Sequence, residues 1–397
     1  MPAENTLPRT SLSRRRLLGT AVCLGVGGAA ARPLPGGVFV AGSDRLRVGL
    51  VGCGGRGTGA AVQALAADAA VAVVAIGDLF ADRLASASAL LERAAGSRFA
   101  CPREARFTGA DAWVRVIDAD VDLVILATPP DCRPRHLAAA VAAGRHVFCE
   151  TPAAIDRSGA ETIREAVALA RDRSLSLMSG LAWRRDRETA ALVRRVHDGA
   201  IGRLLAARMT SLVGLPWQAE PDSGRSAAEG RRRNWVAHPD QSGGDLVERQ
   251  IHAIDKGLWA FGDEDPTAVE PLAAAAAGTT AVRFLFAAGR SLTIHGGRRP
   301  GAIDVVAEIV HGERGRCDLR QPLDAAQAEG RHPGAGRHQA AMADLIRTLR
   351  GGGRMDDGAI LLRATTATLL ARAAVAAGDT LPWPRSTGMK GQRLAPV

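Results

Sequence analysis

The chain has 397 residues, of which 47% are hydrophobic and 23% charged, so it is long enough for two globular domains and ordinary in composition. Its net charge of +10 comes from scattered arginines, aromatic residues make up only 4% and Tyr is absent, which argues against a nucleic-acid-binding protein. The six cysteines form no C-x-x-C pair and no zinc spacing, which argues against a disulfide framework and a metal site.

The first 44 residues have the pattern of an export signal followed by a linker. Ser13-Arg14-Arg15-Arg16-Leu17-Leu18 precedes a Gly- and Ala-rich apolar stretch that ends at Ala29-Ala30-Ala31, a small-residue cleavage site. This pattern is typical of a twin-arginine signal peptide, and the alternative is a disordered basic tail. The apolar stretch of about fifteen residues is too short for a stable membrane span. We therefore expect an exported protein in the periplasm or elsewhere outside the cytoplasm.

The stretch from Leu46 to Gly57 has the pattern of a dinucleotide-binding turn. Val48–Val51 predicts a buried parallel strand, and Gly52, Gly54 and Gly57 follow at the spacing G-x-G-x-x-G. Gly52 permits the tight turn, Gly54 lets the backbone approach a pyrophosphate, and Gly57 lets the next helix pack on the sheet. The N–H groups that begin this helix would face the phosphates.

A second apolar run strengthens this interpretation. Val71–Ile76 predicts another strand, and Asp78 follows it about twenty residues beyond the last glycine of the turn, where an acid that binds a ribose belongs. Strand, glycine turn, helix, strand and acid together predict a dinucleotide site.

Apolar runs alternate with helical patterns up to residue 182, which predicts a doubly wound parallel sheet over residues 45–182. Thr128-Pro129-Pro130 ends one predicted strand and Glu150-Thr151-Pro152 another, both at the carboxyl edge where such sheets bind ligands. Further strands are predicted near Phe107 and at 121–127, 146–149 and 175–178, and helices through 84–91, near Trp113, and over 135–143 and 157–171.

Residues 183–380 have a different pattern, in which strands are grouped and helices follow. This order predicts an α+β domain with helices on one face of a sheet, and residues 381–397 are left as a tail. The predicted elements are a helix over 186–198, a strand over 204–213, a loop over 216–241, a helix over 245–261, strands near 267–272, 279–286, 290–295, 303–310 and 316–319, and helices over 336–350 and 358–377.

The predicted helix over 245–261 carries two stripes. One is apolar and predicted to face the core; it comprises Val247, Ile251, Ile254, Leu258 and Phe261. The other, rotated by about 100°, comprises Glu248, His252, Asp255 and Trp259. A histidine between two acids is a candidate general base, because a nearby carboxylate raises the histidine pKa and fixes its tautomer. The alternative is a surface helix with an incidental histidine.

Five segments together resemble the Gfo/Idh/MocA family of nicotinamide-dependent oxidoreductases, in particular its exported bacterial branch. The resemblance covers nearly the whole mature chain and implies a Rossmann domain followed by a domain with an open-faced, mainly antiparallel sheet. The matching segments are GLVGCGGRGTG at 49–59, LATPP at 126–130 with His136, VFCETP at 147–152, DGAIG at 198–202 and GGDLVERQIHAID at 243–255.

The resemblance also implies roles for residues at matching positions. His252 would exchange the proton of the substrate hydroxyl, with Glu248 and Asp255 beside it, and Arg184 and Trp235 would contact a sugar or polyol. The cofactor, NAD or NADP, would be held by Gly52, Gly54, Gly55, Arg56 and Gly57 at the pyrophosphate, by Asp78 at the adenosine ribose, by Thr128, Pro129 and His136 in the middle, and by Glu150 at the nicotinamide-side ribose.

One position departs from the family pattern. The family has Glu-Lys-Pro after the fifth strand, and its lysine touches substrate and nicotinamide, whereas this chain has Thr151 there. A threonine cannot stabilise a developing alkoxide by charge, an effect worth several kcal/mol in a dry site.

Three functions follow as hypotheses. The first is a sugar or polyol dehydrogenase in which Thr151 only donates a hydrogen bond. The second is a glycosidase or lyase that retains its cofactor and shows no net redox change, which export favours because free cofactor is not regenerated outside the cytoplasm. The third is a nucleotide- or sugar-binding protein that lost catalysis with the lysine. Asp78 favours NAD over NADP, although Arg83 lies nearby in sequence, and a homo-oligomer through the second-domain sheet is expected.

Overall fold

The computed structural model describes residues 45–214, 226–274, 276–298, 304–321 and 336–384. The predicted signal peptide and linker over 1–44 lie outside these ranges, as does most of the predicted tail over 381–397. The export signal and its cleavage site therefore stay predictions.

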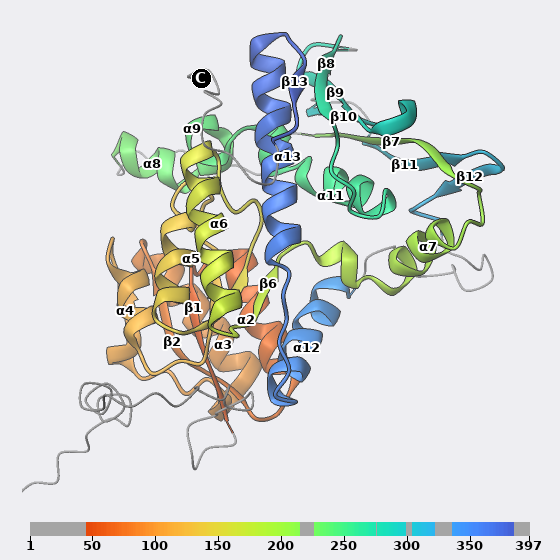
Figure 1. Ribbon diagram of the computed structural model, residues 1–397. Coiled ribbons are helices and arrows are strands. Elements are labelled where there is room, and N and C mark those ends of the chain that lie inside the picture. The colour runs from red at the N-terminus through yellow and green to blue at the C-terminus, as the bar shows by residue number, and fades with distance from the viewer. Residues whose placement is uncertain (1–44, 215–225, 275, 299–303, 322–335, 385–397) are drawn as a thin grey trace, which may run out of the picture. The chain divides into compact units, whose positions relative to one another are not determined.

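The first domain is a doubly wound parallel sheet, as predicted (Figure 1). Its strand order is β3-β2-β1-β4-β5-β6, so the chain reverses direction across the sheet between β1 and β4, where such folds bind ligands. Its strands are β1 (Leu46–Val51), β2 (Val71–Asp78), β3 (Arg106–Thr108), β4 (Leu123–Leu126), β5 (His146–Cys149) and β6 (Leu177–Ser179). Its helices are α2 (Gly55–Ala67), α3 (Ala81–Ala95), α4 (Ala112–Asp118), α5 (Arg133–Ala142) and α6 (Arg157–Asp172).

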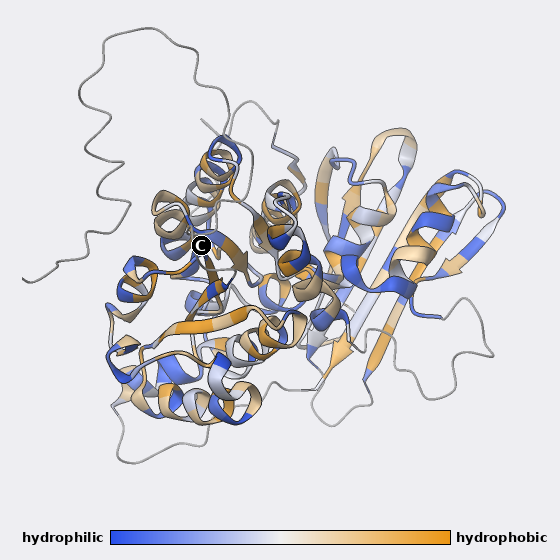
Figure 2. Ribbon diagram, turned by 90° about the horizontal axis from the view of Figure 1, so that it is seen from below, coloured by the Kyte–Doolittle hydropathy of each residue, from blue (hydrophilic) through white to orange (hydrophobic). Residues whose placement is uncertain are grey.

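The strands of this sheet are apolar nearly throughout because helices cover both of its faces. All four residues of β4 are buried, and so are seven of the eight residues of β2. Figure 2 shows this as hydrophobic colour along the strands of the first sheet, against a mixture along the second.

The second domain contains a sheet in the order β12-β11-β7-β10-β9-β8-β13. Only β7 and β10 pair in parallel among the described strands of this sheet, so it is mainly antiparallel, as predicted. Side chains along β10 are buried in near alternation, which marks a sheet with one face on a core. The elements are α7 (Arg187–His197), β7 (Leu204–Val213), β8 (Ala268–Leu272), β9 (Thr279–Leu285), β10 (Ser291–Arg298), β11 (Val305–Gly312), β12 (Gly315–Asp318) and β13 (Leu381–Pro382).

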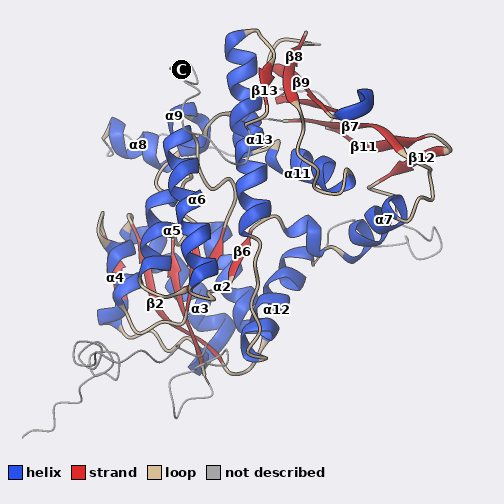
Figure 3. Cartoon of the chain, viewed as in Figure 1, coloured by secondary structure: helices blue, strands red, loops and turns tan. Residues whose placement is uncertain are grey.

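The prediction of a loop over 216–241 was wrong where the structure describes that stretch. Residues 227–242 form α8 (Ala227–Arg233), a 3₁₀ helix (Trp235–Ala237) and α9 (Pro239–Ser242), drawn as short helices in Figure 3. Ser226 caps α8 by accepting a hydrogen bond from the Glu229 N–H. The pattern Ser-x-x-Glu is a helix start signal that hydrophobic periodicity alone does not reveal.

The predicted helix over 245–261 is interrupted, although its apolar stripe is buried as expected. It divides into α10 (Asp245–Glu248) and α11 (Ile251–Ala260). Gln250 at the break is fully buried, and its amide donates to Asp245 and to the Ser211 carbonyl. A buried polar side chain needs hydrogen-bond partners, and Gln250 finds its partners at the point where the helix is interrupted.

The last two helices, α12 (Arg337–Arg350) and α13 (Gly358–Ala377), follow the second sheet. Helix α12 packs on α2, and Met342, Leu345 and Leu349 join the buried cluster that contains Leu50 and Leu65 of the first domain. A segment within the predicted second domain, 183–380, therefore contributes to the core of the first.

Helix α13 is long and apolar enough to be compared with a membrane span, and it is the one such helix among the described residues. Half of its most apolar window is buried inside the protein. Leu361 and Leu370 belong to core clusters of the first and second domains, respectively, so its apolar character is explained by packing between them.

Candidate dinucleotide and substrate site

The turn between β1 and α2 is shaped by its glycines. Gly52 has φ +95°, and a Cβ on Gly57 would lie 1.9 Å from the Gly52 carbonyl oxygen, so neither position accepts another residue without movement. A Cβ on Gly54 or Gly55 would meet nothing within 4 Å. The turn therefore leaves an open cradle at the N-terminus of α2, a helix of 13 residues.

This cradle opens into a cavity of about 650 Å³ at the carboxyl edge of the parallel sheet. The cavity brings together most of the residues predicted to hold a cofactor. Among its lining residues are Gly52, Gly54, Gly55, Arg56, Gly57, Asp78, Thr128, Pro129 and His136. Trp235, predicted as a substrate contact, lines the same cavity and so lies beside the predicted cofactor residues.

Asp78 braces the glycine turn from the end of β2. Its carboxylate accepts hydrogen bonds from the backbone N–H groups of Cys53, at 2.7 Å, and Phe80, at 2.9 Å. The side chain is buried yet lines the cavity. A carboxylate fixed in this way can still accept a hydrogen bond from a ribose hydroxyl through its remaining lone pairs.

His136 lines the same cavity as a neutral ring. Its Nδ1 lies 3.0 Å from the Thr128 hydroxyl, and the ring stacks on Trp113 with centroids 4.5 Å apart. Burial, followed by the charges of Arg135 and Arg133, lowers the His136 pKa to about 3. Its Nε2 is buried with no hydrogen-bond partner in the described chain, so it is available to a ligand.

Arg133, which the sequence analysis did not single out, ties the ends of two strands together. Its buried guanidinium donates to the carbonyls of Thr128, Glu150 and Pro152. The sequence shows only an arginine that follows the Thr-Pro-Pro turn and begins a helix. A single arginine does not indicate which carbonyl groups it will bind.

Glu150 and Arg56 form an ion pair, with Arg56 Nε 2.7 Å from a Glu150 oxygen. Glu150 is buried, and it is absent from the residues that line the cofactor cavity. The Arg56 Nη2 and the Thr151 hydroxyl are each buried without a hydrogen-bond partner among the residues described. Arg56, which pairs with Glu150, and Thr151, which follows Glu150 in sequence, therefore each keep an unused hydrogen-bond donor within the described residues.

His252 lies in the first turn of α11, where its Nδ1 is buried and has no hydrogen-bond partner in the described ranges. Burial is the largest influence on the ring, and positive charges add to it, so that the His252 pKa falls to about 4. The charges belong to Lys256, Arg337, His338 and Arg56. Arg56, the smallest of these influences, belongs to the glycine turn.

The expectation that neighbouring acids raise the His252 pKa was wrong. Asp255 is 2% exposed and directs its carboxylate to Arg184, with the closest atoms 2.7 Å apart. Glu248 ends α10, before the helix break. Burial raises the Glu248 pKa, and the charges of Arg249 and Arg298 oppose this shift.

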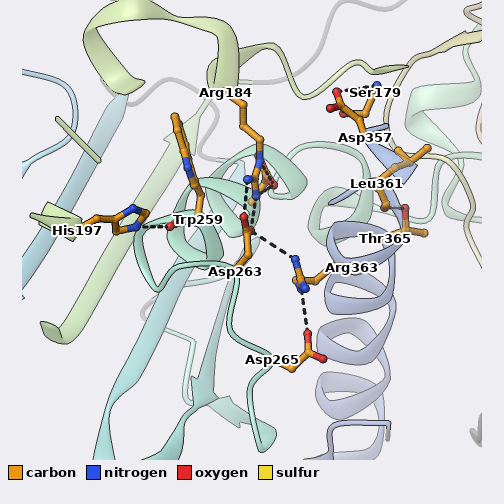
Figure 4. A network of polar contacts seen from close by, with 11 residues as sticks. Ser179, Arg184, His197, Trp259, Asp263, Asp265, Asp357, Leu361, Arg363 and Thr365 are labelled. Carbon is orange, nitrogen blue, oxygen red and sulfur yellow. Dashed lines mark hydrogen bonds and ion pairs between the residues drawn. The ribbon is translucent and has the colours of Figure 1, made fainter. Parts of the chain in front are cut away.

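Arg184, predicted as a substrate contact, lies in a network of ion pairs (Figure 4). Its three guanidinium nitrogens donate to Asp255 and Asp263. Arg363 extends the network from Asp263 to Asp265. These contacts hold the 3₁₀ helix Ala182–Arg185, which precedes α7, against α11, and substrate contact by Arg184 stays a prediction.

Two further cations lie near His252 without having been predicted. Lys256, one turn along α11, is buried, pairs with Glu308 and lies 3.9 Å from the centroid of the Trp183 ring. Arg337 lies 4.3 Å from the centroid of the same ring. Lys256 was detectable as the residue four positions after His252, but Trp183 and Glu308 are too distant in sequence to suggest that contact.

No three His, Cys, Asp or Glu side chains gather closely enough to hold a metal ion within the described ranges. The structure gathers the residues predicted to hold a cofactor, except Glu150, around one cavity, and His252 is not among the residues that line it.

Comparison with known proteins identifies the first domain. Residues 46–181 match the family described as "Oxidoreductase family, NAD-binding Rossmann fold". The chain is 37% identical over 221 residues to inositol 2-dehydrogenase 4 of Saccharopolyspora erythraea, covering 55% of each chain. It is 32% identical over 214 residues to a glycosyl hydrolase family 109 protein of Streptomyces coelicolor, covering 49% of this chain and 43% of the relative.

The likeness extends over both domains in three dimensions. A levoglucosan dehydrogenase in complex with NADH and levoglucosan superposes with a TM-score of 0.66 at 20% identity, covering 86% of this chain and all of that one. At this identity the likeness shows the fold. The chain spans between about a third and three fifths of the length of the first curated relatives that it matches. The glycine turn, the strand order and the sequence matches agree: the first domain, over residues 46–181, belongs to the Gfo/Idh/MocA family of oxidoreductases with an NAD-binding Rossmann fold.

Proposed function

We propose that this protein transfers a hydride between NAD and a hydroxyl-bearing carbon of a sugar or polyol, with His252 as the acid/base group. The observation that carries the proposal is the His252 ring itself, which is neutral near pH 7 and whose Nδ1 is buried without a hydrogen-bond partner in the described chain. A general base must be able to accept a proton at working pH, and a pKa of about 4 keeps the ring in that form.

The residues around the cavity suit a dinucleotide. The open positions at Gly54 and Gly55 and the N-terminus of α2 suit the pyrophosphate, and Asp78 suits a ribose. Thr128, Pro129 and His136 would lie along its middle, and Glu150, positioned by Arg56, would approach the nicotinamide-side ribose. The bound cofactor supplies the hydride donor or acceptor.

The other groups would assist proton transfer in distinct ways. Thr151 would donate its unpartnered hydroxyl to the substrate oxygen. Arg56 and Lys256, whose charges act on His252, would supply the positive potential that the family lysine gives elsewhere. Asp255 and Arg184 would hold α11 in place, and Glu248 would adjust the field at its start.

NAD is proposed over NADP because Asp78 would repel a 2′-phosphate. Arg83, which could have attracted that phosphate, donates to the Arg233 carbonyl at 3.1 Å. Comparison of NAD and NADP affinities tests this assignment, and tighter binding of NADP would contradict it.

A second candidate function is a glycosidase or lyase that retains its cofactor with no net redox change. The similarity to a glycosyl hydrolase family 109 protein favours it. The third possibility, a binding protein without catalysis, rests on Thr151 in place of the family lysine.

The test follows the 340 nm band of the mature protein with NAD during incubation with inositols, levoglucosan and aldoses. A rise that His252→Asn abolishes and His311→Asn, an exposed control on β11, preserves would support the dehydrogenase. Product without a lasting change of the band would favour the second function. If no substrate in the panel changes the 340 nm band of the wild type but the band changes in Thr151→Lys, the third function is favoured.

Export and assembly are proposed with this function. Export by the twin-arginine route predicts that Arg14→Lys/Arg15→Lys/Arg16→Lys retains the protein in the cytoplasmic fraction, and unchanged export would contradict it. Assembly through the second sheet is supported by the exposed apolar residues Leu205 on β7 and Val305 on β11. A monomer by light scattering would contradict it.

A further inference from the structure

Two consecutive arginines of the second domain pair with acids of the first domain. Arg233 at the end of α8 binds Asp82 through two hydrogen bonds of 2.8 Å, and Arg232 lies 2.5 Å from Asp131. Each pair joins residues more than 100 positions apart in sequence. We call residues 226–242 the strap.

The two acids flank the glycine turn. Asp82 follows β2 and Asp131 follows β4, and these strands lie on either side of β1 in the sheet. Because the glycine turn follows β1, a segment pinned at both acids crosses the carboxyl edge beside that turn. In agreement, Arg232–Val236 line the same cavity as Gly52–Gly57.

The strap is fixed by more than two ion pairs. The Arg233 side chain is 11% exposed and lies 4.0 Å from the centroid of the Phe80 ring. Arg83 donates to the Arg233 carbonyl, which adds a contact to the strap backbone. Within the strap, Arg233 also pairs with Glu229, and Ser226 caps the helix that presents both arginines. Both arginines are therefore presented in a defined geometry.

We propose that the strap forms a wall of the cofactor site and sets the rate at which the dinucleotide leaves, with Arg232 and Arg233 as positioning residues. A dinucleotide in the cavity can leave on this side only when both interdomain ion pairs open. The inference rests on the proposed binding of NAD, and it goes further by predicting that release of the dinucleotide is slow.

The test measures release of NADH from the full mature protein. NADH fluorescence is followed after a chase with excess NAD, in the wild type, in Arg232→Gln/Arg233→Gln and in Arg231→Gln. Arg231 is the matched control because it lies in the same helix but pairs with Asp240 within the strap. We expect release to accelerate at least tenfold in the double variant and to stay unchanged in the control.

A charge exchange separates the ion pair from general damage. Asp82→Arg should accelerate release, and Asp82→Arg/Arg233→Asp should restore slow release. Hydrogen exchange of the amides of 227–242 gives a second readout, and it should slow when NADH binds to the wild type.

The outcomes distinguish the two proposals. Equal release rates in the wild type and the double variant, or strap amides that NADH does not protect, would overturn the strap while NAD binding stands. Slow release from a wild type that oxidises or reduces no sugar would support the strap and overturn the proposed hydride transfer. Failure of the wild type to bind NADH at millimolar concentration would overturn both.

Discussion

The glycine turn after β1 and the helix pair around His252, which we propose as two ends of one site, depend on the sequence in opposite ways. At the turn, the groups that matter lie within a few residues of each other, and steric demand fixes their identity. Around His252, the pKa is set by burial and by charges from three separate parts of the chain. Local geometry therefore determines the shape of the glycine turn, whereas tertiary packing determines the protonation state of His252.

The largest expected effect breaks the turn itself. Gly57→Ala places a methyl group against the Gly52 carbonyl, so we expect a loss of about 3 kcal/mol in unfolding free energy and no measurable NAD binding. Gly54→Ala is the matched control, because its added methyl meets open space and its backbone is extended.

Gly54→Ala should keep the unfolding free energy within about 0.5 kcal/mol and lower NAD affinity at least tenfold. Thermal denaturation and fluorescence titration measure both quantities. Unchanged NAD affinity in Gly54→Ala would mean that the cradle does not receive the pyrophosphate.

The second effect concerns the other end of the site. His252→Asn should lower kcat by about 10²- to 10⁴-fold while NAD affinity stays unchanged, because only the acid/base group is lost. In the wild type, kcat/KM should fall as pH falls through the His252 pKa of about 4, where the ring takes up a proton. A fall in kcat/KM near pH 6.5 would show that neither burial nor the surrounding cations lower the His252 pKa.

The third effect tests the ion-pair network beneath α11. Arg184→Met leaves Asp255 buried without its cation, so we expect a loss of about 3 to 5 kcal/mol in unfolding free energy. Arg203→Gln, which removes an exposed pair with Glu313, should change it by less than about 1 kcal/mol. An increase in KM with unchanged stability would instead establish Arg184 as a substrate contact.

The smallest effect is a dependence of stability on pH. The pKa of His136 is lower in the folded protein than in the unfolded chain, so the unfolded chain binds more protons between about pH 3 and pH 6.5. Stability should therefore fall as pH falls below 6.5, and His136→Asn should reduce this slope by up to about 1.4 kcal/mol per pH unit. Denaturation at pH 7, 6 and 5 measures it, and identical slopes would contradict the neutral buried ring.

The difference between the two ends also explains which predictions succeeded. Apolar runs such as 71–76 and 204–213 form strands, as predicted, because their side chains are buried on one or both faces. The residue types of each run alone indicate this burial. The strap at 226–242 was missed because its helices are short and polar, and their contacts are ion pairs to Asp82 and Asp131 in the first domain. Periodicity cannot register such partners.

The sequence by itself determined the glycine turn, the order of strands and helices outside 226–261, and the buried apolar stripe of residues 247–261, because each follows from steric demand or hydrophobic spacing within a short window. Only the tertiary structure decided the charge state of His252, the pairing of Glu150 with Arg56 and the placing of α12 on the first domain. The physical reason is that desolvation and Coulomb interactions depend on distances in space. Folding brings together groups that lie far apart along the chain, and their positions in the sequence do not show which of them will meet.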